Sequence, residues 1–212
     1  MTSVTQDKSQ PKRRMSAADR REAILDAALD EFAGKGFYET SLEGVARRAG
    51  ISKALIYEHF RSKVELHEAL LRRYRHRLLE RVIEASSTPR TAEQRLRAGA
   101  DAFFGFVEEN REPWKLMVRN PAQAVGETQG QMAQAVAALI HADTPAEVED
   151  QYPDTELRAQ MAGQQLVGSM RALAIWWDGH REVPRQRLVQ ALMNFAWVGM
   201  ERLRSGEPRW EP

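Results

Sequence analysis

The sequence predicts an all-α protein of roughly nine or ten helices. Apolar residues recur at the three- and four-residue spacing of helices along most of the 212 residues. No segment alternates apolar and polar residues as a half-buried strand does. Several of the expected helices begin with a Ser or Thr followed three residues later by Glu or Gln, which is the capping-box pattern.

A polar, basic arm precedes the first expected helix. Residues 1–15 contain the basic run 12–14 and no apolar stretch, so we expect a flexible arm and no secretory signal there. Ser16 is placed to cap the first helix, which Gly34 and Gly36 are expected to end. The apolar face of this helix consists of Ile24, Leu25, Ala28, Leu29 and Phe32.

Two short helices are expected next. Thr40 and Glu43 are the ends of a capping box in which the Thr40 hydroxyl accepts a hydrogen bond from the amide of Glu43. Gly50 tolerates the left-handed backbone conformation, and it is expected to end the first short helix. Ser52 is expected to cap the second, which runs from Lys53 through Phe60.

A long helix follows the short pair. The capping box at 62–65 opens it, and it continues to about Ala85. At a rise of ~1.5 Å per residue such a helix spans ~35 Å, which is enough to connect two domains. Pro89 and a third capping box at 91–94 mark the next boundary.

The rest of the chain is expected to contain five or six more helices. One has an apolar face of Leu96, Ala100, Phe103, Phe104, Phe106 and Val107. Pro113 is expected to break the chain before a short helix, and a weak segment with Gly126 and Gly130 precedes the next. The acidic residues 142–153 predict a loop. Two long helices close the chain, at about 154–178 and 184–204.

The charge is unevenly distributed. The whole chain has 31 Lys and Arg against 30 Asp and Glu, a net charge of +1. Residues 1–90 contain 18 of these basic residues and 13 of the acidic ones, whereas residues 91–212 contain 13 and 17. A basic first part beside an acidic second part indicates that only the first part meets a polyanion. Ordinary scatter is the alternative, so the motifs must decide.

Composition excludes several classes of protein. The absence of cysteine excludes a disulfide scaffold, a Cys-ligated metal site and thiol catalysis. No apolar run of ~18 residues exists, so we expect no membrane span and a cytoplasmic location. The chain has no GxSxG, HExxH, P-loop or GxGxxG pattern, and its histidines are scattered. We therefore expect neither an enzyme nor a bound metal or cofactor.

The two short helices have the proportions of a helix-turn-helix motif. In that motif the second helix enters the major groove of DNA and the first crosses the backbone. Gly50 permits the sharp turn. A small core is expected from Leu42, Val45, Ala46, Leu55 or Ile56, and Phe60. Short helical hairpins also occur in proteins that never touch DNA, and spacing alone leaves both possibilities open.

A family resemblance favours DNA binding. Residues 40–66, TSLEGVARRAGISKALIYEHFRSKVEL, resemble the signature of tetracycline-repressor (TetR) family transcriptional regulators. The match extends over about residues 18–66, and its most specific part is the run Tyr57-x-His59-Phe60-x-Ser62-Lys63. Ala54 and Leu55 depart from the Gly and small residue that the family often has there, so the operator sequence is not predicted. Beyond residue 70 the resemblance is architectural only.

The resemblance implies a homodimeric regulator with two domains. Residues 16–62 would be the helix-turn-helix DNA-binding domain, and residues 63–212 the domain that binds a small-molecule effector and dimerises. Its partners would be a pseudo-palindromic operator in double-stranded DNA, an effector and a second copy of the chain. Release of a repressor by the effector is the expectation, although no residue decides between repression and activation.

The resemblance also implies which residues contact DNA: Thr40, Ser41, Ser52, Lys53, Ala54, Leu55, Tyr57, His59 and Lys63. The Thr and Ser hydroxyls near the start of the first short helix can bind a phosphate. Lys53 can pair with guanine, and the two apolar residues after it can touch a thymine methyl. Tyr57 and His59 can hydrogen-bond phosphates, and Lys63 adds a positive charge. The alternative is that Tyr57 is a core aromatic and His59 an ordinary surface residue.

The second domain offers candidates for a ligand pocket and a dimer interface. The expected pocket residues are Tyr74, Phe103, Phe104, Trp114, Met117, Trp176 and Trp177. The expected interface residues, on the last two helices, are Leu157, Met161, Met170, Leu188, Leu192 and Phe195. Residues of these types are also ordinary core, and packing within one chain is the alternative. A helical ligand-binding or catalytic bundle remains the competing class of protein.

Overall fold

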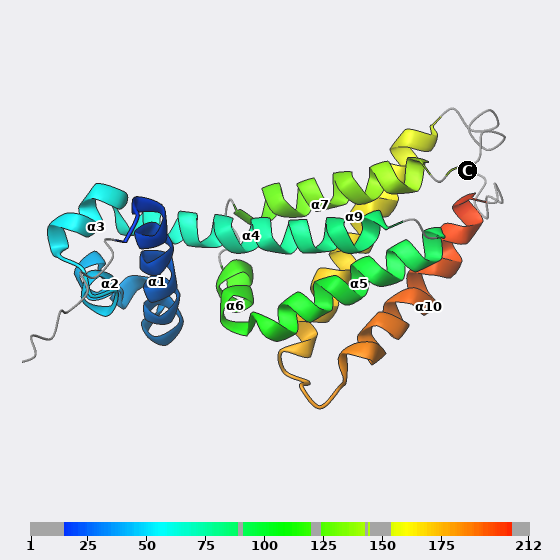
Figure 1. The fold of residues 1–212 in the computed structure, drawn as a ribbon. Helices are drawn as coiled ribbons and strands as arrows, with labels where there is room; N and C mark the ends of the chain where they lie inside the picture. The colour runs from blue at the N-terminus through cyan, green and yellow to red at the C-terminus, as the bar shows by residue number, and fades with distance from the viewer. Residues whose placement is uncertain (1–14, 89–90, 120–123, 143, 145–153, 205–212) are drawn as a thin grey trace, which may run out of the picture. The chain divides into compact units, whose positions relative to one another are not determined.

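The fold is all-α, as the sequence predicts. The computed structural model describes residues 15–88, 91–119, 124–142, 144 and 154–204, which form nine α-helices and no strand (Figure 1). The chain divides into two compact units, Met1–His67 and Glu68–Pro212, whereas the sequence predicted a boundary between residues 62 and 63. No helix in the described ranges is long and apolar enough to cross a membrane.

The first unit contains three helices and the start of a fourth. These are α1 (Ala17–Glu39), α2 (Leu42–Arg48), α3 (Lys53–His59) and the first residues of α4 (Lys63–Ser87) (Figure 1). Their core side chains include Ile24, Leu25, Ala28, Phe32, Val45, Ile56 and Phe60, all of which are at most 3% exposed. α2 contacts both α1 and α3, and a small apolar core holds the three helices together.

Ser caps begin the helices of this unit, with one correction to the prediction. Ser16 caps α1, accepting a hydrogen bond from the Asp19 amide at 3.0 Å. α2 is capped by Ser41 and not by Thr40, because the Ser41 hydroxyl accepts from the Gly44 amide at 3.1 Å. The capping box predicted from Thr40 is therefore wrong by one residue.

The Thr40 side chain has a different role. It is buried, and its hydroxyl donates toward the carbonyl oxygens of Gly36 at 2.7 Å and Glu31 at 3.1 Å. Gly36 has φ +77° and interrupts α1, after which one further turn reaches Glu39. Thr40 thus fastens the end of α1 where its backbone leaves the helical conformation.

The described residues of the second unit form the rest of α4 and five further helices (Figure 1). They are α5 (Ala92–Glu109), α6 (Arg111–Arg119), α7 (Ala124–Ala142), α9 (Thr155–Trp177) and α10 (Arg185–Arg204). The most extensive helix contacts are those of α7 with α9 and of α5 with α10. The helices expected at 154–178 and 184–204 are confirmed within one residue at each end.

Close approaches and ion pairs fix these helices. A Cβ added to Gly163 on α9 would lie 2.5 Å from the carbonyl oxygen of Ala133 on α7, so only glycine permits this spacing. Arg185 joins α10 to α5 through Asp101 at 3.1 Å and Glu108 at 3.4 Å. Backbone contact thus holds one pair of helices, and charged side chains help to hold the other.

Some predicted boundaries differ from the observed ones. The capping box at 91–94 is confirmed by reciprocal hydrogen bonds. α6 already begins at Arg111, so Pro113 lies in its first turn, where no intrahelical N–H bond is needed. α7 begins at Ala124, and the segment predicted as weak, with Gly126 and Gly130, is helical. Most of the expected arm 1–15 and loop 142–153 lies outside the described residues.

Candidate functional site

The turn between α2 and α3 has the predicted conformation. Gly50 has φ +67°, and the Ile51 amide donates to the Ala46 carbonyl at 3.0 Å to close the turn. Ser52 then caps α3 by accepting from the Leu55 amide at 3.2 Å. Ile56 is fully buried and Leu55 is half-buried, so Ile56 is the core residue that the sequence left undecided between these two.

The opposite face of α3 is open to solvent. Lys53 and Ala54 are exposed, and Tyr57 is 42% exposed, which excludes the alternative that Tyr57 is a core aromatic. His59 is half-buried, and its carbonyl oxygen accepts from Arg21 at 3.3 Å. The Arg21 guanidinium also lies 4.3 Å from the ring centre of Phe60, so α1 supports the end of α3.

Glu43, which the sequence indicated only as part of a capping box, contacts two of these exposed side chains. Glu43 on α2 lies 2.8 Å from the Lys53 ammonium and accepts from the Tyr57 hydroxyl at 3.3 Å. The hydrogen bond from Lys53 is the main cause that lowers the pKa of Glu43, and the same bond raises the pKa of Lys53. Both groups are therefore firmly charged at neutral pH.

Lys63 and Ser41 differ from Thr40 in accessibility. The Lys63 ammonium donates to the Tyr38 carbonyl at 3.0 Å and lies 4.7 Å from the ring centre of Phe37. An ammonium has three donors, so others remain for a phosphate. Ser41 is exposed, whereas Thr40 is 3% exposed with its hydroxyl engaged by carbonyls. The phosphate contact expected of the Thr40 hydroxyl does not fit this structure.

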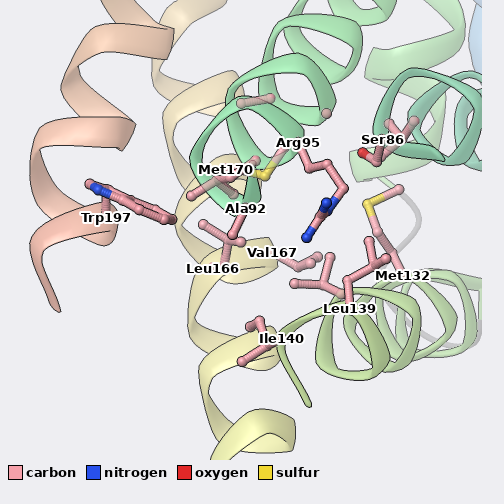
Figure 2. A pocket seen from close by; sticks show the side chains of 15 residues that line it. Ser86, Ala92, Arg95, Met132, Leu139, Ile140, Leu166, Val167, Met170 and Trp197 are labelled. Carbon is pink, nitrogen blue, oxygen red and sulfur yellow. The ribbon is translucent and has the colours of Figure 1, made fainter. Parts of the chain in front are cut away.

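Two cavities of the second unit have different walls. The larger, which we name the Arg95 cavity, has an empty volume of about 700 Å³ that is partly open to solvent, and its walls are residues of α4, α5, α7, α9 and α10. Figure 2 shows the Arg95 side chain reaching in among apolar side chains, with the Ser86 hydroxyl on one side and Trp197 of α10 on the other. None of the aromatic residues predicted for the pocket lines this cavity.

The smaller cavity contains three of the predicted residues. This Trp114 cavity has an empty volume of about 500 Å³, and Phe103, Trp114 and Met117 form part of its wall. The two cavities share the wall residues Met132 and Val167. These spaces remain where several apolar helix faces, with bulky and small residues at their contacts, pack together. No local sequence pattern marks them.

The other four predicted pocket residues line neither cavity. Phe104 and Trp177 pack edge to face in the core, with ring centres 6.4 Å apart. Trp176 is 47% exposed and stacks on His180, and the ring of Tyr74 is covered by Arg73 and Arg77. Their aromatic character thus reflects core and surface packing.

The residues predicted for the dimer interface divide between two faces of α9 and α10. Leu157, Met161 and Phe195 are exposed, and Ile175 and Val198 add to the exposed apolar surface of the same two helices. Three others, Met170, Leu188 and Leu192, are at most 4% exposed. These three belong to the core of the subunit, so their assignment to the interface is corrected. Helical periodicity alone did not show which apolar face of each helix is covered within the chain.

Comparison with known proteins agrees with this architecture. The family model described as "Bacterial regulatory proteins, tetR family" matches residues 24–70, and "Tetracyclin repressor-like, C-terminal domain" matches residues 92–199.

No group of three or more metal-binding side chains occurs in the part of the chain that the structure describes.

Several relatives extend the comparison. The chain is 32% identical over 191 residues to the HTH-type transcriptional activator FasR of Mycolicibacterium smegmatis, covering 88% of this chain and 85% of that protein. It is 43% identical over 65 residues to the regulator RutR of Escherichia coli, 31% of each chain. A TetR-like regulator from Rhodococcus sp. RHA1 has a similar structure, with a TM-score of 0.71 and 27% identity over 89% of this chain and 99% of that chain. The chain therefore belongs to the TetR family and is a DNA-binding transcriptional regulator.

Proposed function

We propose that the protein binds a pseudo-palindromic operator in double-stranded DNA as a homodimer and that a small molecule releases it, so that it acts as a repressor. The observation that carries this proposal is the capped α3, whose exposed face presents Lys53, Ala54 and Tyr57 while Ile56 anchors its other face. A rigid helix with exposed polar side chains is what major-groove reading requires.

The proposed DNA contacts are of two kinds. Lys53, Ala54 and Leu55 begin α3 and would reach base edges, while Ser41, Ser52, Tyr57, His59 and Lys63 would hold phosphates. Base contacts supply specificity, and the phosphate contacts supply most of the salt-dependent affinity.

The proposed dimer uses the exposed side chains of α9 and α10. Leu157, Met161 and Phe195 are at least 50% exposed, which is unusual for large apolar residues on neighbouring helices. Against a symmetry mate, the two helices would form an isologous four-helix interface. A dimer also places two copies of α3 on the two halves of a palindrome.

The proposed effector is a small molecule with a largely apolar surface, because the Arg95 cavity has mostly apolar walls. α4 is one uninterrupted helix with Lys63 in its first turn and Ser86, a wall residue of that cavity, near its end. A ligand that shifts α4 would change the position of Lys63. Allosteric coupling of ~1–3 kcal/mol corresponds to a 5- to 150-fold change in operator affinity.

The relative FasR favours activation as a second candidate, since it is named a transcriptional activator. The two candidates differ in their effect on RNA polymerase. In transcription in vitro from a promoter that contains the selected operator, a repressor lowers the yield of transcript and an activator raises it. Addition of the effector should reverse whichever effect is seen.

DNA binding is tested by selecting duplexes from a random pool and measuring their affinity by fluorescence anisotropy at several salt concentrations. Lys63→Ala should weaken all sequences alike and lower the slope of log K against log salt by about 1 per subunit. The matched control is Lys115→Ala on α6, which removes an equal charge from the second unit. An unchanged slope for Lys63→Ala would show that Lys63 does not contact phosphate.

A further inference from the structure

The wall of the Trp114 cavity includes a tryptophan whose buried indole N–H lacks an acceptor among the described residues. Trp114 is 5% exposed, and its indole N–H has no hydrogen-bond partner among the described residues. Trp177 provides a contrast within the same unit, because its indole N–H donates to the Val183 carbonyl at 2.7 Å. A buried N–H without a partner has lost its hydrogen bonds to water and has gained no hydrogen bond in return. An acceptor supplied from outside the chain would therefore bind there favourably.

The other polar side chains in the wall are also mainly donors. Arg75 and Arg171 carry guanidinium groups, Gln129 carries an amide, and no Asp or Glu is part of the described wall. The remaining wall is apolar and includes Phe103 and Met117. Because charges interact more strongly in such surroundings than in water, the wall favours a negative charge on an otherwise apolar molecule.

We propose that the Trp114 cavity binds a small molecule with a carboxylate group on an apolar or aromatic skeleton, and that the carboxylate accepts a hydrogen bond from the indole N–H of Trp114. Arg171 balances its charge, and Phe103 and Met117 contact its skeleton. The inference goes beyond the proposed function, which places its effector in the Arg95 cavity, because the Trp114 cavity is a second site that shares only Met132 and Val167 with it. A singly charged carboxylate suits the cavity better than a phosphate dianion, because the apolar wall makes loss of hydration costlier for the second charge.

The test uses the full-length protein labelled with 15N and 3-phenylpropanoate as the probe. The chain has five tryptophans, so the spectrum is expected to hold five indole N–H resonances, and the one missing in Trp114→Phe identifies Trp114. We expect titration with 3-phenylpropanoate to shift that resonance downfield, as a hydrogen bond to a carboxylate does. The neutral analogue 3-phenylpropan-1-ol should bind at least tenfold more weakly.

Matched variants separate recognition from loss of structure. Trp114→Phe should weaken 3-phenylpropanoate ~tenfold or more, because a hydrogen bond to a charged group is lost. Trp176→Phe is the control, since Trp176 is exposed and lines neither cavity, and it should leave the affinity unchanged. Arg171→Gln on half-buried Arg171 should weaken the carboxylate but not the alcohol, and it serves as the decisive variant if Trp114→Phe does not fold.

Three results would overturn the inference: no binding of 3-phenylpropanoate, binding that leaves the Trp114 resonance unmoved, or equal affinity for the acid and the alcohol. The spectrum reports on the cavity without DNA. A protein that binds its selected operator but not the probe therefore refutes this inference alone. A protein that binds the probe but no DNA refutes the proposed function of the first unit.

Discussion

Glu43 places a negative charge beside two residues that the proposed DNA interface requires. Its carboxylate contacts the Lys53 ammonium at 2.8 Å and the Tyr57 hydroxyl at 3.3 Å. DNA phosphates and base edges must compete with that carboxylate for the same donors. Glu43 should therefore lower the affinity for DNA of every sequence, as an internal competitor.

Replacement of Glu43 by Gln keeps the shape of the side chain and removes its charge. We expect Glu43→Gln to bind a random duplex about threefold more tightly per subunit, which is the range of an exposed ion pair. The gain should largely vanish in a Lys53→Met background, where only the Tyr57 hydrogen bond is left to release. Fluorescence anisotropy measures both, with Glu58→Gln on α3 as the control for loss of one negative charge. A gain that persists without Lys53 would instead indicate direct repulsion of phosphate by Glu43.

Thr40 and Ser41 are neighbours with different roles. Thr40→Val removes a buried hydroxyl and leaves its carbonyl partners without that donor, so it should cost about 1–3 kcal/mol of unfolding free energy. Ser41→Ala removes the cap of α2 and should cost about 1 kcal/mol. Chemical denaturation followed by circular dichroism measures both. At a temperature where both variants are folded, Thr40→Val should keep its DNA affinity; weaker binding at unchanged stability would contradict the structural role of Thr40.

The sequence predicted single residues well where the cause is local. Ser16, Ser52 and Gly50 act as expected because a cap or a left-handed turn depends on a few neighbouring residues. Thr40 was misplaced because Glu43 follows it at the capping-box spacing, whereas the actual cap, Ser41, is followed by Gly44 and the Thr40 hydroxyl is engaged by carbonyls of α1. The contact of Glu43 with Lys53 is not local, so no motif predicted it.

The contact between α7 and α9 depends on one glycine. A Cβ on Gly163 would meet the Ala133 carbonyl oxygen at 2.5 Å and the Ala137 amide at 3.2 Å. These are backbone atoms and cannot rotate away, so the helices would have to separate. The short distance between α7 and α9 therefore depends on Gly163. This glycine has a packing role, in addition to its low helix propensity.

Gly163→Ala should destabilise the protein by about 1–3 kcal/mol through overpacking, despite the better helix propensity of Ala. Gly130→Ala on α7 is the matched control, because its Cβ would meet nothing within 4 Å. That substitution should stabilise by up to ~1 kcal/mol. Urea unfolding measures both midpoints, and a stabilising Gly163→Ala would show that α7 and α9 do not pack this closely in solution.

At the level of elements, helix type and order were predictable, and helix ends near proline and glycine were not. The spacing of apolar residues defined α5, α9 and α10, and a cap marked the start of α5. α6 and α7 begin earlier than expected because Pro113 is tolerated in a first turn and because packing overrides the weak propensity of Gly126 and Gly130.

The proposed dimer is a property of the whole molecule. Phe195 is 77% exposed on α10, so Phe195→Asp should leave the fold of the subunit intact while it places a charge in the interface. Burying a Phe side chain contributes about 1.5–3 kcal/mol and a symmetric interface buries it twice, so dissociation should increase at least ~100-fold. Light scattering coupled to gel filtration measures the mass. Ile83→Asp, on exposed Ile83 of α4, should remain dimeric.

The sites of the second unit could be predicted only in part. Aromatic and Met residues at helical spacing indicated a ligand-binding region, and three of them, Phe103, Trp114 and Met117, do line the Trp114 cavity. The Arg95 cavity was missed because its walls come from five helices and are mostly aliphatic. A cavity is what helices leave unfilled when they pack, and that depends on long-range geometry.

α9 has cavity-lining residues such as Leu166, Val167 and Met170 and, elsewhere on its surface, the exposed Leu157 and Met161. In the proposed function, a single helix would thus take part in two equilibria, occupancy by an effector and association with a second subunit. Thermodynamic reciprocity requires that any influence of one on the other acts equally in reverse. In a cell, the effector concentration that gives half-maximal response should then depend on how many copies of the regulator are present, so changes in its expression would retune the dose–response curve.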